Sequence, residues 1–457
     1  MSCVAPGCCC GPLRAAAERT ASRMDPVYIA VVGLGVMFLF MVLGMPIGFA
    51  MLLAGLIGNT VLLSSAAATH LLATNLWDQF SSYGLSVVPL FVLMGQFAYR
   101  AGVTERLYSA AYTWVGRMPG GLASTTIVAS AGFSAICGSN SATTATMGTI
   151  ALPEMRRYNY DPALSAGAVA VGGTLGVVIP PSVVLIVIAV QTEQSLLRLF
   201  LAGIIPGLIL TALLVLTILV LCARKPALGP VGPQTSWGEK FRALSGVIET
   251  LVLFVLVIGG LYAGIFTPTE AGAAGACGAL AIGLIRRHLS FKSIVLAVGE
   301  TLRISSMVVL MIAGAVLFGR FLTVSRLPFE LADWAAQLPV APSVVLLVVL
   351  LIYLVGGALM DALGFLVVTT PIFFPLALAL NFDPVWFTIL LTVVTTMGAI
   401  TPPVGVNVFI VNGLAPEIPI TRILRGVAYF MLAYVVCIAA IWFVPETVLW
   451  LPDFLLN

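Results

Sequence analysis

The sequence predicts an all-α polytopic membrane protein built from two inverted repeats, and three observations lead to this prediction. The chain has 457 residues, of which 60% are hydrophobic and only 9% are charged, and its mean hydropathy is +1.12. A soluble globular domain carries roughly 25% charged residues, so the composition excludes that class. Apolar runs of about 18 residues or more recur along the chain, which is the length that a helix needs to span a bilayer. Helix-breaking residues also recur at a constant offset of 222 positions.

Residues 1–23 precede the first apolar run and differ from the rest of the chain. They have no apolar core, so they are not a signal peptide. A second methionine, Met24, stands directly before the first apolar run. We therefore expect residues 1–23 to be an N-terminal extension or the result of a wrongly assigned start. Four of the eight cysteines cluster here, in a pattern typical of a metal or lipidation site: Cys3, Cys8, Cys9 and Cys10.

The first repeat is predicted to cover residues 24–222 and to begin with three spans. In chain order we expect the spans Val27–Leu43 and Ile47–Leu63, an interfacial segment Ser64–Tyr83, the span Leu85–Tyr99 and a surface helix Arg100–Arg117.

A polar run separates the next two apolar segments, Gly121–Ile136 and Ala142–Met155. Each segment is short for a span. An unsatisfied polar group in hydrocarbon costs several kcal/mol, so the run must be buried in protein or line a wet cavity. These features predict a re-entrant hairpin with a polar tip.

A discontinuous helix is predicted over Pro162–Val190, with its interruption at Gly172–Pro181, because tandem prolines remove backbone donors and clash with the preceding turn. Leu196–Cys222 is expected to close the repeat, and residues 223–248 to link it to the second one.

The second repeat, residues 249–457, follows the same plan shifted by 222 positions. The offset relates Pro46 to Pro268, Asp161 to Asp383 and the pair Pro180–Pro181 to Pro402–Pro403. It predicts three spans, a hairpin around the tip Gly356–Gly364, a broken helix and a last span: Thr250–Gly264, Thr269–Arg286, Arg303–Leu322, Ser343–Val355 with Phe365–Leu378, Pro384–Val411 interrupted at Gly398–Pro403, and Ile420–Val444.

Five crossings and one hairpin per repeat place the second repeat upside down, which is the inverted-repeat plan of secondary transporters. This topology would put fifteen of the 21 Lys and Arg residues on one side of the membrane. If that side is cytoplasmic, both termini are periplasmic. The first hairpin then enters from the cytoplasm and the second from the periplasm.

Helix interruptions expose carbonyl oxygens, which suit a hard cation such as Na⁺, and helix N-termini, which favour a carboxylate. The two halves therefore predict two related Na⁺ sites with an anionic substrate between them. For the first site we expect Ser139 and Asn140, with carbonyls around Gly176, Ile179 and Pro181. For the second we expect Asp361, with carbonyls around Gly398, Thr401 and Pro403. We expect the substrate to contact Ser141, Thr143, Thr144 and Asn407.

Structural alternatives remain open for these residues. Ser139 and Asn140 also suit a helix cap at a tight turn. Asp361 also suits a buried, hydrogen-bonded structural role, and the tandem prolines could only kink their helices. Glu270, at a helix start, is interpreted first as a cap.

The sequence contains no residue pattern typical of an enzyme or of nucleic-acid binding. His70 and His288 lie far apart, and no Walker A motif is present, so ATP is not the direct energy source. A channel is the main alternative class, but a pore needs a continuous polar lining, whereas polarity here is confined to two mid-depth breaks.

Four motifs closely resemble the large membrane subunit of tripartite ATP-independent periplasmic (TRAP) transporters, the DctM-like proteins. They are Phe133–Thr144, Gly148–Met155, Gly173–Ser182 and Gly398–Asn407, and the resemblance extends from about Met24 to the C-terminus.

The resemblance implies Na⁺-coupled uptake of an organic acid by an elevator motion in the bacterial inner membrane. The acid could be a dicarboxylate, a sialic acid or another carboxylate, delivered by a periplasmic binding protein. A small four-helix membrane subunit would complete the scaffold, and we expect it to be a separate chain. The alternative is a stand-alone Na⁺- or H⁺-coupled anion transporter without a binding protein.

Overall fold

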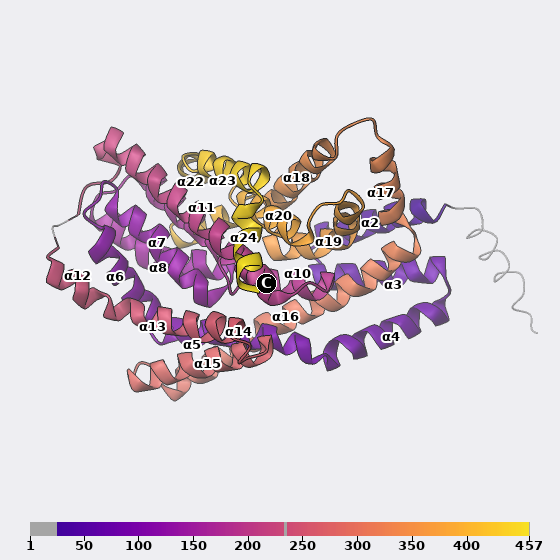
Figure 1. Ribbon diagram of the computed structural model, residues 1–457, viewed down its shortest axis with the longest axis horizontal. Helices are drawn as coiled ribbons and strands as arrows, with labels where there is room; N and C mark the ends of the chain where they lie inside the picture. The colour runs from indigo at the N-terminus through magenta and orange to yellow at the C-terminus, as the bar shows by residue number, and fades with distance from the viewer. Residues whose placement is uncertain (1–24, 233–234, 457) are drawn as a thin grey trace, which may run out of the picture.

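The computed structural model describes residues 25–232 and 235–456, and all regular secondary structure in these residues is helical (Figure 1). The predicted extension 1–23 and its four cysteines lie outside the described residues. The first half contains α2 (Pro26–Val42), α3 (Ile47–Leu62), α4 (Ser65–Ser81), η1 (Tyr83–Ser86), α5 (Val87–Arg100), α6 (Val103–Val115), α7 (Gly121–Cys137), α8 (Asn140–Arg157), α9 (Pro162–Val178), α10 (Val183–Thr192), α11 (Leu196–Arg224) and η2 (Pro226–Leu228).

The second half includes a π-helical turn and a helix of 34 residues. It contains α12 (Trp237–Ala243), α13 (Ser245–Phe254), a π-helical turn η3 (Val255–Gly259), α14 (Gly260–Tyr262), α15 (Pro268–Ile285), α16 (Phe291–Val324), α17 (Leu327–Gln337), α18 (Pro342–Leu359), α19 (Ala362–Ala379), α20 (Pro384–Gly398), α21 (Val406–Leu414), α22 (Ile420–Ala428), α23 (Met431–Phe443) and α24 (Glu446–Leu456).

The described residues include seven helical segments that are long and apolar enough to cross a membrane, or up to nine if each bent pair counts as one span. The polytopic membrane fold predicted from the sequence is therefore confirmed. The count of ten crossings and the inverted relation of the two halves stay predictions.

Equivalent positions of the two halves share their local geometry where a helix begins. Asp161 caps α9 by accepting hydrogen bonds from the backbone N–H groups of the next two non-proline residues, at 2.9 and 3.1 Å. Asp383 caps α20 in the same way, with two bonds of 2.9 Å. A proline stands at the first helical position after each aspartate, where its missing N–H costs nothing.

Both interruptions of the discontinuous helices are shorter or shifted relative to their predicted positions. The first break covers only Ile179–Ser182, and α9 continues through Gly172 and Gly173. Gly173 is needed for close packing, because a Cβ there would overlap the Thr144 side chain of the neighbouring α8. In the second half α20 ends at Gly398 and α21 begins at Val406.

The tip of the second hairpin is much shorter than the predicted Gly356–Gly364. Helix α18 continues to Leu359, so that only Met360 and Asp361 lie between the two arms. The glycines predicted to break the helix allow close packing instead, because a Cβ on Gly357 would lie 2.5 Å from the Thr395 carbonyl oxygen. Two other segments also differ from prediction: Ile420–Val444 is bent by 43° between α22 and α23, and Arg303–Leu322 belongs to a helix of 34 residues, α16.

The two hairpins lie on opposite sides of the molecule, with α7 and α8 on the left of Figure 1 and α18 and α19 on the right. Each hairpin packs against the half-helix of the other half of the chain, since α8 contacts α21 and α19 contacts α10. Long helix pairs, α3 with α16 and α5 with α15, form the layer beside them.

A buried glutamate connects the helix that leads into the first hairpin to this layer. Glu249 on α13 accepts hydrogen bonds from Arg106 on α6 at 2.9 and 2.6 Å, and from Arg286, which follows α15, at 2.8 Å. The side chain of Glu249 is only 8% exposed. This network positions α6 relative to two helices that are distant in the sequence.

Part of the predicted linker 223–248 binds the base of the first hairpin. The backbone carbonyl of Gly229 accepts a bond from Gly120 N–H at 3.1 Å, and Tyr160 Oη donates to the Pro230 carbonyl at 2.7 Å. Burial raises the pKa of Tyr160 to about 12. The linker also contains α12 and the start of α13.

Candidate functional site

The polar tips of the two hairpins and the first helix break meet at a small cavity of about 90 Å³, here called the central cavity. Three residues predicted as cation ligands line it: Ser139, Asn140 and Asp361. Residues of α5 and α16 close its other side. The remaining lining residues are Val92, Gly95, Gln96, Cys137, Gly138, Ala142, Val177, Val183, Val184, Ile304, Val308 and Leu363.

Asp361 connects the two hairpins through its carboxylate. Ser141 Oγ, on the first hairpin, donates a hydrogen bond to Asp361 Oδ1 at 3.3 Å. Asp361 Oδ2 accepts from the Leu363 backbone N–H at 3.1 Å, which caps α19. The carboxylate is therefore a helix cap and a lining group of the central cavity at the same time.

The first helix break packs closely against the tip of the first hairpin. Val183 N–H donates to the Gly138 carbonyl at 3.1 Å, and Gly138 adopts a left-handed φ of +63°. A Cβ added to Gly176 would lie 2.6 Å from the Ser139 carbonyl oxygen and 2.9 Å from Thr143 Oγ1. The fold thus brings two oxygen atoms of the hairpin tip against the last turn of α9.

Two oxygen atoms at this junction lack their usual hydrogen-bond partner. Pro180 has no N–H, so the Gly176 carbonyl has no partner four residues ahead in the helix. Thr143 Oγ1 is buried, and no partner for it is found in the described part of the chain. A buried unpaired oxygen costs free energy, so the cluster has the chemistry of a site for a hard cation.

The second helix break repeats this packing, with one difference. Gly405 N–H donates to the Ala358 carbonyl of the second hairpin at 2.9 Å. The Gly398 carbonyl accepts the Thr401 N–H at 2.8 Å, and Thr401 Oγ1 donates to the Met397 carbonyl at 2.6 Å. Within residues 25–232 and 235–456, no hydrogen bond joins Asp361 to Gly398, Thr401 or Pro403. The structure therefore brings Asp361 to the first half of the chain.

Asn407 connects the second break to the first hairpin. Its Nδ2 donates to Asn140 Oδ1 at 2.7 Å and to the Ala170 carbonyl at 2.8 Å. Thr144, also predicted to contact substrate, donates to the Asn140 carbonyl at 3.0 Å. Asn407, Thr143 and Thr144 are fully buried and lie outside the lining of the central cavity, so protein groups are their present neighbours.

One polar residue of the central cavity was missed by the sequence analysis. Gln96 of α5 lines the cavity opposite the hairpin tips. The available signal was a single amide in an otherwise apolar span. Its position relative to the hairpins depends on the packing of α5 and could not be derived from the repeat.

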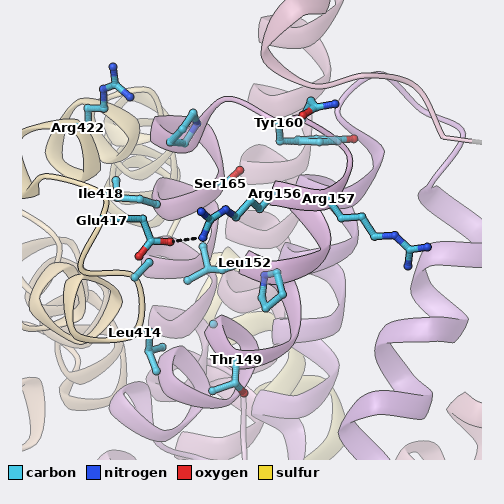
Figure 2. Close-up of a pocket in the computed structure, with 15 residues that line it drawn as sticks. Thr149, Leu152, Arg156, Arg157, Tyr160, Ser165, Leu414, Glu417, Ile418 and Arg422 are labelled. Atoms are coloured by element: carbon cyan, nitrogen blue, oxygen red, sulfur yellow. Dashed lines mark hydrogen bonds and ion pairs between the residues drawn. The ribbon is translucent and has the colours of Figure 1, made fainter.

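A larger groove of about 1060 Å³ lies at the outer end of the first hairpin, between α8, α9, α21 and α22 (Figure 2). Arg156 reaches across it to Glu417, with 2.9 Å between Nη1 and Oε1. None of the predicted site residues lines this groove. The smaller central cavity is therefore the candidate site. Within the described residues, no cluster of three or more His, Cys, Asp or Glu side chains could hold a metal ion.

Comparisons with known proteins cover nearly the whole chain. The family described as "Tripartite ATP-independent periplasmic transporter, DctM component" matches residues 34–447. The C4-dicarboxylate TRAP transporter large permease protein DctM of Pseudomonas aeruginosa PAO1 is 35% identical over 397 residues, which are 87% of this chain and 92% of that protein. The sialic acid TRAP transporter large permease protein SiaM of Vibrio cholerae is 31% identical over 415 residues, covering 91% and 96%.

Two further comparisons extend this pattern. The isethionate TRAP transporter permease protein DctMQ of Oleidesulfovibrio alaskensis is 34% identical over 396 residues, which cover 86% of this chain and 61% of that protein. Among solved structures, the YdaH transporter of Alcanivorax borkumensis aligns with a TM-score of 0.59 over 92% of this chain and 99% of that one. Its sequence identity is 18%, so it supports the fold alone.

Proposed function

The chain belongs to the DctM family of tripartite ATP-independent periplasmic transporters, and from this premise we propose that it imports an organic acid by Na⁺ symport. It would be the large permease subunit, a transporter and not an enzyme. The observation that carries the proposal is the meeting of both hairpin tips and a helix break at the central cavity.

The electrostatics of the central cavity support an anionic substrate. The N-termini of α8 and α10 open onto it through Asn140, Val183 and Val184. The helix dipole favours negative charge at such positions. Organic acids are also the substrates named for relatives, among them C4-dicarboxylates, sialic acid and 2,3-diketo-L-gulonate.

The first break supports the proposal of a Na⁺ site. Ser139, Thr143 and Gly176 present oxygen atoms within one small region, and the Thr143 hydroxyl is buried without a partner in the described residues. We propose that these oxygens, with Asn140 and the carbonyls of Ile179 and Pro181, would hold one Na⁺. The bound cation would supply positive charge next to the substrate carboxylate.

A second Na⁺ site remains part of the proposal. We assign Asp361 to it, together with the carbonyls around Gly398, Thr401 and Pro403. Since Asp361 contacts Ser141 in this structure, the second site would form when that contact is exchanged.

The size of the central cavity supports movement during transport. Sites for small ligands usually enclose about 300–1,000 Å³, and the central cavity has about 90 Å³. Helices α5 and α16 close it on one side. We propose that the hairpins and broken helices slide past these helices as an elevator, which would open the cavity to each side in turn.

The family also supplies the proposed partners and location. We propose a small membrane subunit and a periplasmic binding protein as partners, in a bacterial inner membrane with both termini periplasmic. The binding protein would select the organic acid, so the substrate is proposed only as a carboxylate.

Uptake by reconstituted vesicles tests this function. The chain would be reconstituted with its small subunit, and a binding protein loaded with radiolabelled dicarboxylate or sialic acid would be added outside. We expect accumulation only with an inward Na⁺ gradient, and none when K⁺ replaces Na⁺ or the binding protein is omitted. Equal uptake by the chain alone without Na⁺ would overturn the proposal.

A further inference from the structure

An apolar groove runs along the outer face of the molecule between α11 and α23. It has a volume of about 360 Å³ and is open along one side. Helix α11 contributes residues at alternating spacings of three and one, which is a single face of a helix. The lining residues of both helices are Leu213, Leu216, Thr217, Val220, Leu221, Arg224, Tyr429, Leu432, Ala433 and Val436.

The groove is apolar everywhere except at one end. Thr217 Oγ1 donates to the Leu213 carbonyl of its own helix at 2.8 Å, so its hydroxyl is satisfied. Leu216 and Leu432 are 54% and 71% exposed, which is expected for side chains that face lipid. The polar end is formed by Arg224, in the last turn of α11, and Tyr429, at the bend between α22 and α23.

The length of the groove matches one leaflet of a bilayer. Eleven residue steps separate Leu213 from Arg224, which is about 16 Å along an α-helix. Half of the hydrocarbon core of a bilayer is roughly 15 Å thick. An acyl chain lying in the groove would therefore place its headgroup at the level of Arg224.

The charge at this end selects among lipids. Arg224 is exposed, Lys225 follows it, and neither forms an ion pair with another described residue. Among the lining residues, which all belong to the described part of the chain, none is acidic. In the predicted orientation this end faces the cytoplasmic leaflet, whose anionic lipids bind basic pockets between helices.

We propose that this groove is a binding site for an anionic phospholipid, with an acyl chain between α11 and α23 and the phosphate at Arg224. The site lies away from the central cavity and does not depend on the proposed function. It would attach the face formed by α11 and α23 to the cytoplasmic leaflet.

Native mass spectrometry of the purified full-length chain, titrated with phosphatidylglycerol or phosphatidylcholine, tests the proposal. We expect the wild type to prefer phosphatidylglycerol. Arg224→Gln should reduce that preference about fivefold, since one basic residue near anionic lipid contributes about 1 kcal/mol. Arg224→Lys should largely retain it, and Arg117→Gln, at another exposed arginine, should leave it unchanged.

A second pair of variants tests the acyl-chain groove itself. Leu216→Trp would fill the groove and should weaken binding of both lipids, whereas Leu208→Trp adds the same ring to an exposed position of α11 outside the groove and should not. Equal affinity of the wild type for both lipids, or an unchanged preference in Arg224→Gln, would overturn the proposal. The proposal would also be overturned if Leu216→Trp bound the small subunit more weakly but bound both lipids as well as the wild type does. That result would identify a protein helix as the occupant of the groove.

Discussion

Ser141 on the first hairpin donates a hydrogen bond to Asp361 on the second hairpin, across 220 residues of sequence. This is the one direct side-chain bond found between the two tips among the described residues. A side-chain hydrogen bond within a protein contributes roughly 0.5–1.5 kcal/mol. The bond therefore couples the two tips and holds the carboxylate at the central cavity.

The first prediction concerns this bond. Ser141→Ala should lower the Na⁺ concentration needed for half-maximal uptake, because the second Na⁺ site is proposed to form when the contact between Ser141 and Asp361 is exchanged. Asp361→Asn should lower maximal uptake at least tenfold, because it removes the carboxylate that we propose as a ligand of the second Na⁺ site. Uptake as a function of Na⁺ concentration measures both effects. Ser306→Ala, at an exposed position of α16, is the control, and an unchanged Na⁺ dependence in Asp361→Asn would remove this residue from the proposed site.

The second prediction tests the first Na⁺ site. In Gly176→Ala the new methyl group would lie 2.6 Å from the Ser139 carbonyl oxygen and 2.9 Å from Thr143 Oγ1, so these oxygens must move. We expect Na⁺ to raise the apparent melting temperature of the wild type over its value in K⁺, and this increment to become smaller in the variant, which disrupts only the first proposed site. Gly35→Ala is the matched control, since a Cβ there meets nothing within 4 Å. An intact increment in Gly176→Ala would place Na⁺ elsewhere.

Residues that interrupt helices account for the part of the fold that the sequence predicted well. Tandem prolines cannot donate backbone hydrogen bonds, so both discontinuous helices were located within a few residues. Glycine was less informative, because it serves both as a breaker and as a point of close packing. Gly356 and Gly357 were predicted to form a tip, but they lie inside α18, against Phe365 and Thr395. Which role a glycine has depends on a neighbour that the local sequence does not specify.

The repeat does not predict which residues of the two halves are in contact. The 222-residue offset relates Ser139 to Asp361 as equivalents, but equivalent positions need not touch. The observed partner of Asp361 is Ser141, and Asn407 reaches Asn140 rather than a residue of its own half. Such pairs arise because α8 packs against α21 and α19 packs against α10. The sequence therefore predicted three residues that line the central cavity, but not which residues of the two halves are in contact.

The third prediction assigns Asn407 a positioning role. Asn407→Ala removes two buried hydrogen bonds and leaves Asn140 Oδ1 and the Ala170 carbonyl without this donor. We expect a loss of about 2 kcal/mol of stability. Asn407→Asp should cost more, since a carboxylate would face two acceptor oxygens. Melting temperatures of the purified variants measure this loss of stability. Asn412→Ala should have a smaller effect, because the Asn412 amide makes a single, partly buried hydrogen bond to the Ile418 carbonyl. A direct substrate ligand would instead show weaker substrate affinity at unchanged stability.

The last prediction compares two glutamates that form ion pairs in different environments. Glu249 is 8% exposed and binds two arginines, whereas Glu417 is 50% exposed and binds Arg156, which is 76% exposed. Exposed pairs contribute roughly 0–1 kcal/mol, because water and salt screen them. Removing one partner of a buried pair leaves the other charge uncompensated and costs more.

Glu249→Gln should therefore destabilise the protein by about 2 kcal/mol, and Glu417→Gln by at most about 0.5 kcal/mol. The glutamine retains the shape but can satisfy only one arginine through its single oxygen. Loss of the Glu249 carboxylate should also weaken the attachment of α6, because Arg106 on α6 is bonded to Glu249 on α13. Hydrogen exchange should therefore rise in α6 before it rises in α8. Equal destabilisation by the two variants would mean that the Glu249 network is hydrated in the membrane-embedded protein and that packing alone positions α6.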